Sequence, residues 1–155
     1  MWGLKAAGIR DCAWILVLAL AATALAGCHR TPAEQQVRQA IAGAVAAARS
    51  NDVHGVLGVV TDDFTGNHGD LDRRGLHQLL AVRALRQDQT GVLVGPISFQ
   101  HRGGRIVATF NLVLTGGKPG DLVPRDSAVY AMTTAWRLDG GYWRCYNATW
   151  TGSGS

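Results

Sequence analysis

The sequence contains no hydrophobic run long enough for a typical membrane-spanning helix. Its longest hydrophobic stretch without charge extends over 16 residues, from Cys12 to Gly27. A helix needs about 20 apolar residues to cross a bilayer. The stretch therefore fits a transmembrane anchor poorly, and another role has to be found for it.

Positive charge is not concentrated in any part of the chain. The 155 residues carry a formal net charge of +4, and Arg73-Arg74 is the only adjacent pair of basic residues. Nucleic-acid-binding domains usually gather their basic residues on one face or in one run. We therefore expect no nucleic-acid partner.

Cysteine and proline are scarce, with three and four residues. Cys12, Cys28 and Cys145 have neither the spacing of metal ligands nor that of a redox motif. The sequence therefore predicts neither a metal site nor a cofactor. Charged residues make up 17% and hydrophobic residues 47%, which excludes a disordered chain. The length fits one domain.

The first thirty residues have the order of a secretory signal peptide. Lys5 and Arg10 precede the uncharged stretch, which ends in small residues. The sequence Leu25-Ala26-Gly27-Cys28 resembles the lipobox of bacterial lipoproteins. In that family the cysteine thiol receives a diacylglycerol and cleavage occurs before it. The resemblance implies that residues 1–27 are removed and that Cys28 is the lipid-attachment residue. The alternatives are an ordinary signal cleaved after "ATALA" and a buried N-terminal helix.

The resemblance also implies a location. Two or more acyl chains give stable membrane anchoring, whereas one chain binds only marginally. His29 follows the cysteine, and in this family aspartate at that position favours inner-membrane retention. We therefore expect a lipid anchor in the bacterial cell envelope, at the outer membrane and facing the periplasm. Residues 28–31 form a short tether, of which three residues span at most about 10 Å, so the domain should lie close to the membrane.

Three helices are predicted at the start of the mature chain. Thr31-Pro32-Ala33-Glu34 matches a capping box with proline at the first helical position. Asp72 can cap the third helix. Between the second and third helices, residues 61–75 are rich in turn-forming residues and predict a loop. The predicted helices cover 32–48, a segment from Asn51 with an apolar stripe that reaches Val60, and 73–87.

After Gln89 the hydrophobic pattern changes from helical to alternating. Gly103-Gly104 and Asp139-Gly140-Gly141 are typical of hairpin turns. The predicted strands cover 91–100, 105–115, 127–138 and 142–150. Helices followed by such strands predict an α+β fold, in which three N-terminal helices pack on a curved antiparallel four-stranded sheet.

This order of elements resembles the nuclear transport factor two-like, or cystatin-like cone, superfamily. Two segments carry the resemblance, "VLGVVTDDFTGNHGDLDRRGL" and "WRLDGGYWRCYNATW". It implies a cone-fold domain over 32–151, with a flexible tail at 152–155, and a pocket between helices and sheet. The superfamily hosts isomerases, dehydratases, transport adaptors and binding modules, so the fold alone does not give the activity. By the same analogy, a homodimer or an envelope protein partner could contact the sheet.

Acidic residues are absent from the four predicted strands. An acid–base site would need a carboxylate or imidazole facing the pocket, with a pKa raised by burial. An apolar lining with a few hydrogen-bonding groups instead favours a small-ligand-binding or protein-assembly module without a catalytic site, although the same aromatic residues could simply fill the core. The ligand-pocket candidates are Phe110, Tyr130, Met132, Trp136, Trp143, Tyr146 and Asn147.

The alternative function is an isomerase- or lyase-like enzyme of the same superfamily. Its acid–base residue would be Asp62, Asp63 or His68, in the densest polar segment of the chain. This segment does not match a calcium-binding loop, and helix capping and turn formation explain it more simply. A third possibility is a structural envelope protein with a filled core. Cys145 has no predicted partner, and we expect it to be buried.

Overall fold

The computed structural model describes residues 31–86, 89–117 and 126–153. The chain divides into two compact units, Met1–Thr31 and Pro32–Ser155, and all the described helices and strands belong to the second. Within the described ranges, no helix is both long enough and apolar enough to cross a membrane.

The described residues form three α-helices, α2 (Ala33–Arg49), α3 (Val53–Leu57) and α4 (Arg73–Leu85). Buried Val37 and Ile41 lie one turn apart on α2, so this helix packs an apolar stripe against the core. Asp72 caps α4 as predicted, because its Oδ1 accepts a hydrogen bond of 2.7 Å from the Gly75 N–H.

The start of α2 differs from the predicted capping box. Pro32 occupies the N-cap position in place of Thr31, and its side chain makes no cap hydrogen bond. Glu34, the predicted acidic residue of the box, lies 2.7 Å from the Nε2 of His101 on strand β4 (Ser98–Arg102). The side chain that was expected to close the first turn therefore ties the helix to the sheet.

The sheet is mixed and has seven strands, so the predicted antiparallel four-stranded sheet is wrong. Strand order is β2-β1-β7-β6-β5-β3, and β4 also pairs with β5. All neighbouring strands are antiparallel except β1 and β7, which are parallel. The strands are β1 (Val60–Gly66), β2 (Leu71–Asp72), β3 (Gln89–Val94), β4, β5 (Arg105–Gly117), β6 (Asp126–Asp139) and β7 (Tyr142–Ser153).

Strands β1 and β2 lie where the sequence predicted a loop, and α4 follows them, so the helices are not all N-terminal. The second helix ends at Leu57, and Val60 belongs to β1 instead. Phe64 of β1 is buried, whereas the two acidic residues before it are exposed. The sequence did not reveal this strand, because its residues are typical of turns and its partner β7 lies about 80 residues further along the chain.

The predicted strand 91–100 is two strands, β3 and β4, which pair with successive halves of β5. Pro96 lies at the break, and proline has no N–H to donate to a neighbouring strand. The hairpin between β4 and β5 is confirmed. Gly103 and Gly104 form its two-residue turn with φ angles of +48° and +55°, which glycine adopts without steric cost.

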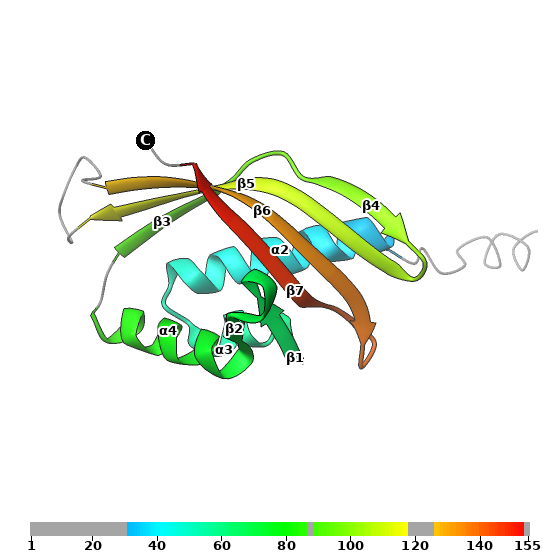
Figure 1. Cartoon of the computed structure of the whole chain (residues 1–155), viewed down its shortest axis with the longest axis horizontal. Helices are drawn as coiled ribbons and strands as arrows, with labels where there is room; N and C mark the ends of the chain where they lie inside the picture. The colour runs from blue at the N-terminus through cyan, green and yellow to red at the C-terminus, as the bar shows by residue number, and fades with distance from the viewer. Residues whose placement is uncertain (1–30, 87–88, 118–125, 154–155) are drawn as a thin grey trace, which may run out of the picture. The chain divides into compact units, whose positions relative to one another are not determined.

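Figure 1 shows the helices of the second unit gathered on one face of the curved sheet, with α2 next to the strands and β1 beside β7. The core between these layers contains Val37, Phe64, Ile106 and Trp136, all 4% exposed or less.

Candidate functional site

A cavity of about 310 Å³ lies between the helices and the sheet. Its volume is at the lower end of the range of about 300–1,000 Å³ that is typical of ligand pockets. Among the described residues that line it, none is an acid, a base or a histidine, and most are aliphatic or aromatic. The walls come from α2, α3, α4 and every strand of the sheet except β4.

The few polar groups in the lining are already hydrogen-bonded. Thr134 Oγ1 donates to the Ala108 carbonyl at 3.2 Å and accepts from the indole N–H of Trp136 at 2.8 Å. The Cys145 thiol lies 3.2 Å from the Asn147 carbonyl. A ligand in this cavity therefore meets hydrocarbon rather than free donors or acceptors.

Cys145 is the one thiol among the described lining residues, and it is 5% exposed and free of any disulfide. Its burial confirms the expectation from the sequence. Burial raises the pKa of the thiol to about 12 by disfavouring the thiolate, although hydrogen bonds to the backbone of Asn147 and Ala135 oppose the shift. The thiolate, not the thiol, is the nucleophile, so Cys145 is inert at neutral pH.

The structure brings three of the seven ligand-pocket candidates to the cavity wall, Phe110, Met132 and Trp136. The other four do not line it. Trp143 packs against the hydrophobic core instead. The Asn147 side-chain amide donates to the carbonyl and hydroxyl oxygens of Thr65, at 3.2 and 3.0 Å. Tyr146 lies under two arginines, and Tyr130 lies outside the lining set.

A β-bulge in β7 explains part of this division. Ala135 pairs with Asn147 but Trp136 pairs with Cys145, so Tyr146 is the extra residue. Inward-facing positions are therefore odd-numbered before the bulge, as at Cys145, and even-numbered after it, as at Ala148. Regular alternation along 142–150 does not predict this change.

Several wall residues were not predicted as pocket residues. Phe64 and Leu71 belong to β1 and β2, in a segment where the sequence predicts a loop. Ala44 and Ala48 lie on α2 at helical spacing that was visible in the sequence, and their small side chains leave space beside the sheet. The periodic pattern marked this face as buried but did not distinguish packed from hollow regions.

The three acid–base candidates all lie outside the cavity lining. Asp62 is exposed, with Oδ1 3.6 Å from the Arg73 Nε. His68 is exposed in the 3-10 turn η1 (Asn67–Gly69), where its φ of +63° lies in the left-handed region. Neither side chain therefore reaches a substrate bound in this cavity.

Asp63 makes the most specific polar contact of the three. Both of its carboxylate oxygens accept hydrogen bonds from Arg137, at 2.7 and 3.0 Å. These bonds, with a smaller contribution from the Thr61 hydroxyl, lower the pKa of Asp63 to about 2. A general acid or base near neutral pH needs the opposite shift. No group of three or more His, Cys, Asp or Glu residues in the described part of the chain could hold a metal ion.

No family model matches the sequence, and no match is found among curated proteins. Solved structures do match. ActVI-ORFA of Streptomyces coelicolor has a TM-score of 0.68 at 14% identity, over 79% of this chain and 96% of that one.

An NTF2-like protein with a cystatin-like fold from Novosphingobium aromaticivorans has a TM-score of 0.64 at 19% identity, over 96% of this chain and 90% of that one. An NTF2-like protein from Pseudomonas putida has a TM-score of 0.63 at 18% identity, over 77% and 85%. At these identities the likeness concerns the fold alone. The chain thus has the NTF2-like, or cystatin-like, α+β fold that the sequence resemblance predicted.

Proposed function

We propose that this chain is a lipid-anchored protein of the bacterial cell envelope whose domain binds a small apolar ligand in the cavity. The observation that carries the proposal is the cavity wall, which presents hydrocarbon on every side. Burial of apolar ligand surface there contributes about 25 cal/mol per Å². Because the walls belong to packed helices and strands, little of this is lost to ordering the protein.

The placement of the polar residues favours binding over catalysis. The cavity lining, as far as the structure describes it, contains no acid or histidine, and its thiol is held neutral. Asp63, the candidate with the best-defined geometry, is held ionised by Arg137 on the outside of the sheet. The isomerase- or lyase-like alternative therefore has no acid or histidine among the described residues of the cavity wall.

The anchor is proposed from the sequence pattern. Cys28 and the signal-like segment lie outside the described residues, and the lipobox resemblance supports acylation of the Cys28 sulfur. With His29 rather than aspartate after the cysteine, the outer membrane is the proposed location, with the domain facing the periplasm. The first described helix begins at Ala33, which leaves only a short tether and keeps the domain near the bilayer.

Met132 offers a direct reporter for ligand binding. The chain contains two methionines, Met1 and Met132, and Met132 lines the cavity. Full-length protein labelled with [¹³C-methyl]methionine and held in lipid nanodiscs is titrated with decanol, an uncharged apolar chain. We expect a saturable shift of the Met132 methyl resonance, which the Met132→Leu variant assigns.

Two alanines of α2 provide a matched pair of variants. Ala44 lines the cavity, whereas Ala46 on the same helix is exposed. Ala44→Phe should fill the cavity and abolish the shift, and Ala46→Phe should bind decanol as the wild type does. An unchanged Met132 resonance in the wild type, or equal binding by both variants, would overturn the proposed function.

A further inference from the structure

The apolar cavity continues toward the C-terminal end of α4. A smaller hollow of about 100 Å³ shares the lining residues Ala48, Val56 and Leu114 with the cavity. Leu79 and Arg83 also line this hollow. Leu79 and Arg83 in turn belong to an open groove of about 550 Å³ along α4. The shared wall residues indicate one continuous path from the cavity to this groove.

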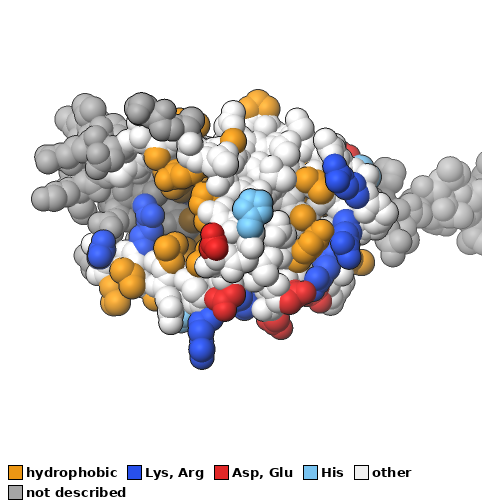
Figure 2. Space-filling view, in the orientation of Figure 1, with side chains coloured by type: hydrophobic (Ala, Val, Ile, Leu, Met, Phe, Trp, Pro, Cys, Tyr) orange, Lys and Arg blue, Asp and Glu red, His pale blue; other side chains and the backbone are white. Residues whose placement is uncertain are grey.

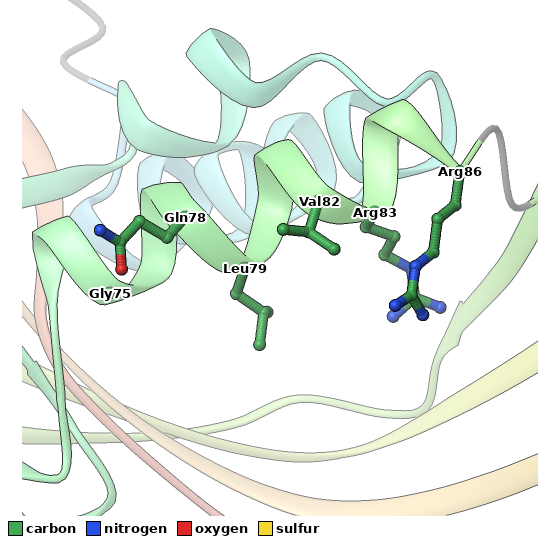
Figure 3. A pocket seen from close by; sticks show the side chains of 6 residues that line it. All are labelled: Gly75, Gln78, Leu79, Val82, Arg83 and Arg86. Carbon is green, nitrogen blue, oxygen red and sulfur yellow. The ribbon is translucent and has the colours of Figure 1, made fainter.

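Residues of α4 that line the groove change from apolar to basic along the helix. Leu79, Val82, Arg83 and Arg86 are spaced by three or four residues, which places them on one side of a helix. Figure 3 shows their side chains pointing from α4 toward the strands. Leu79 and Val82 are 56% and 50% exposed, so this apolar segment is not covered by the described part of the domain.

Two arginines lie at the outer end of the path. Arg83 and Arg86 line the open groove, and no acidic residue is among its described lining residues. The acid nearest along the path, Asp52, lines the smaller hollow and accepts a hydrogen bond from the Gly55 N–H at 2.9 Å. Hydrophobic and basic side chains lie next to one another on the left of Figure 2, over this end of α4.

We propose that the ligand is a single-chain anionic amphiphile, with its hydrocarbon chain in the cavity and its carboxylate or phosphate head at Arg83 and Arg86. This inference rests on the proposed function. The guanidinium group donates two parallel hydrogen bonds to such a head, and a pair of them at the mouth of an apolar cavity matches both halves of the molecule. The size of the cavity fits one chain rather than a two-chain lipid.

The test compares two ligands that differ only at the head, decanoate and decanol, each below its micellar concentration. The full-length protein in zwitterionic nanodiscs carries the Met132 methyl label. For each ligand, the apparent Kd of Arg83→Gln/Arg86→Gln is divided by that of the wild type, so that partition of the ligand into the lipid cancels. Arg74→Gln is the control, because Arg74 is on the same helix but does not line the groove.

We expect the double variant to bind decanoate about tenfold more weakly than the wild type, because two charged contacts with the head group are lost, and to bind decanol unchanged. The control should bind both ligands as the wild type does. Equal binding of decanoate by double variant and wild type, or an equal loss for both ligands, overturns the arginine site alone. A Met132 resonance that neither ligand shifts in the wild type overturns the proposed function, and the arginine site with it.

Discussion

At the scale of single residues, Arg137 contacts two side chains on the outside of the sheet, those of Asp63 and Tyr146. Its guanidinium group donates to both oxygens of Asp63 and lies 5.4 Å from the ring centroid of Tyr146. Arg105 lies over the same ring at 5.3 Å. The pKa of Arg137 is raised, mainly by its hydrogen bonds to Asp63. Asp63, which is a catalytic candidate in the sequence, therefore connects β1 to β6.

This contact predicts how the Asp63 carboxyl group titrates. Arg137→Gln should move the pKa of Asp63 from about 2 toward its ordinary value of 3.8, because the largest cause of the shift is lost. The control is Arg105→Gln. Arg105 lies over the Tyr146 ring in the wild type, so its replacement should leave the pKa of Asp63 unchanged. Both are measured from the carboxyl ¹³C chemical shift as a function of pH.

The sign for stability follows from the lowered pKa. A carboxyl group with a lower pKa in the folded state stabilises that state fully above its unfolded pKa, and this contribution is lost as pH falls toward about 2. The difference in stability between wild type and Arg137→Gln should therefore shrink on acidification below pH 4. An Asp63 pKa that stays near 2 in Arg137→Gln would show that another group causes the shift.

At the scale of elements, Arg73 joins three of them. It is the first residue of α4, and its Nη1 donates to the Leu57 carbonyl at the end of α3, at 2.8 Å, and to the Val60 carbonyl at the start of β1, at 3.0 Å. Both carbonyl groups lie where the chain passes from helix to strand. One side chain therefore links α3, α4 and β1.

Arg73→Ala should lower the free energy of unfolding by about 1–3 kcal/mol, because partly buried carbonyl groups lose hydrogen bonds from a charged donor. Arg74→Ala should change it by less than about 0.5 kcal/mol, since Arg74 is exposed. Denaturant unfolding of both variants gives the comparison. Similar values for the two would mean that the Arg73 contacts contribute little.

The elements differ in how far the sequence predicts them. Local signals found α2, α4 with its Asp72 cap, and the Gly103-Gly104 hairpin, because each depends on residues close together in the chain. Strand β1 was missed, since a parallel pair with β7 leaves no mark within its own seven residues. Pro96 was a visible signal that the segment 91–100 contains a break.

The cavity was predictable in kind but not in outline. The absence of acids from the strands predicted apolar walls, and the structure brings Met132 and Trp136 to them. Tyr146 was a pocket candidate but lies outside the cavity lining, at the bulge where the register of β7 changes by one residue. A bulge is set by the pairing of two strands, so neither strand alone predicts it.

At the scale of the whole molecule, the proposed lipid anchor predicts how the chain is processed. In its native host, the wild type should lose residues 1–27 and gain the mass of two or three acyl chains on the new N-terminal cysteine. Cys28→Ser should keep the N-terminal segment and gain no lipid, because serine lacks the thiol. Cys145→Ser should be processed like the wild type, since Cys145 is buried in the domain. Intact mass spectrometry of membrane fractions distinguishes these results, and a Cys28→Ser protein with the wild-type mass shift would exclude the anchor.

Native mass spectrometry of the protein gently extracted from its own membrane tests binding in the cavity most directly. Besides its covalent lipid, the wild type should carry one noncovalent apolar molecule, which Ala46→Phe keeps and Ala44→Phe loses because the new ring fills the space. The same adduct on Ala44→Phe as on the wild type, or no adduct on any of the three proteins, would contradict the account.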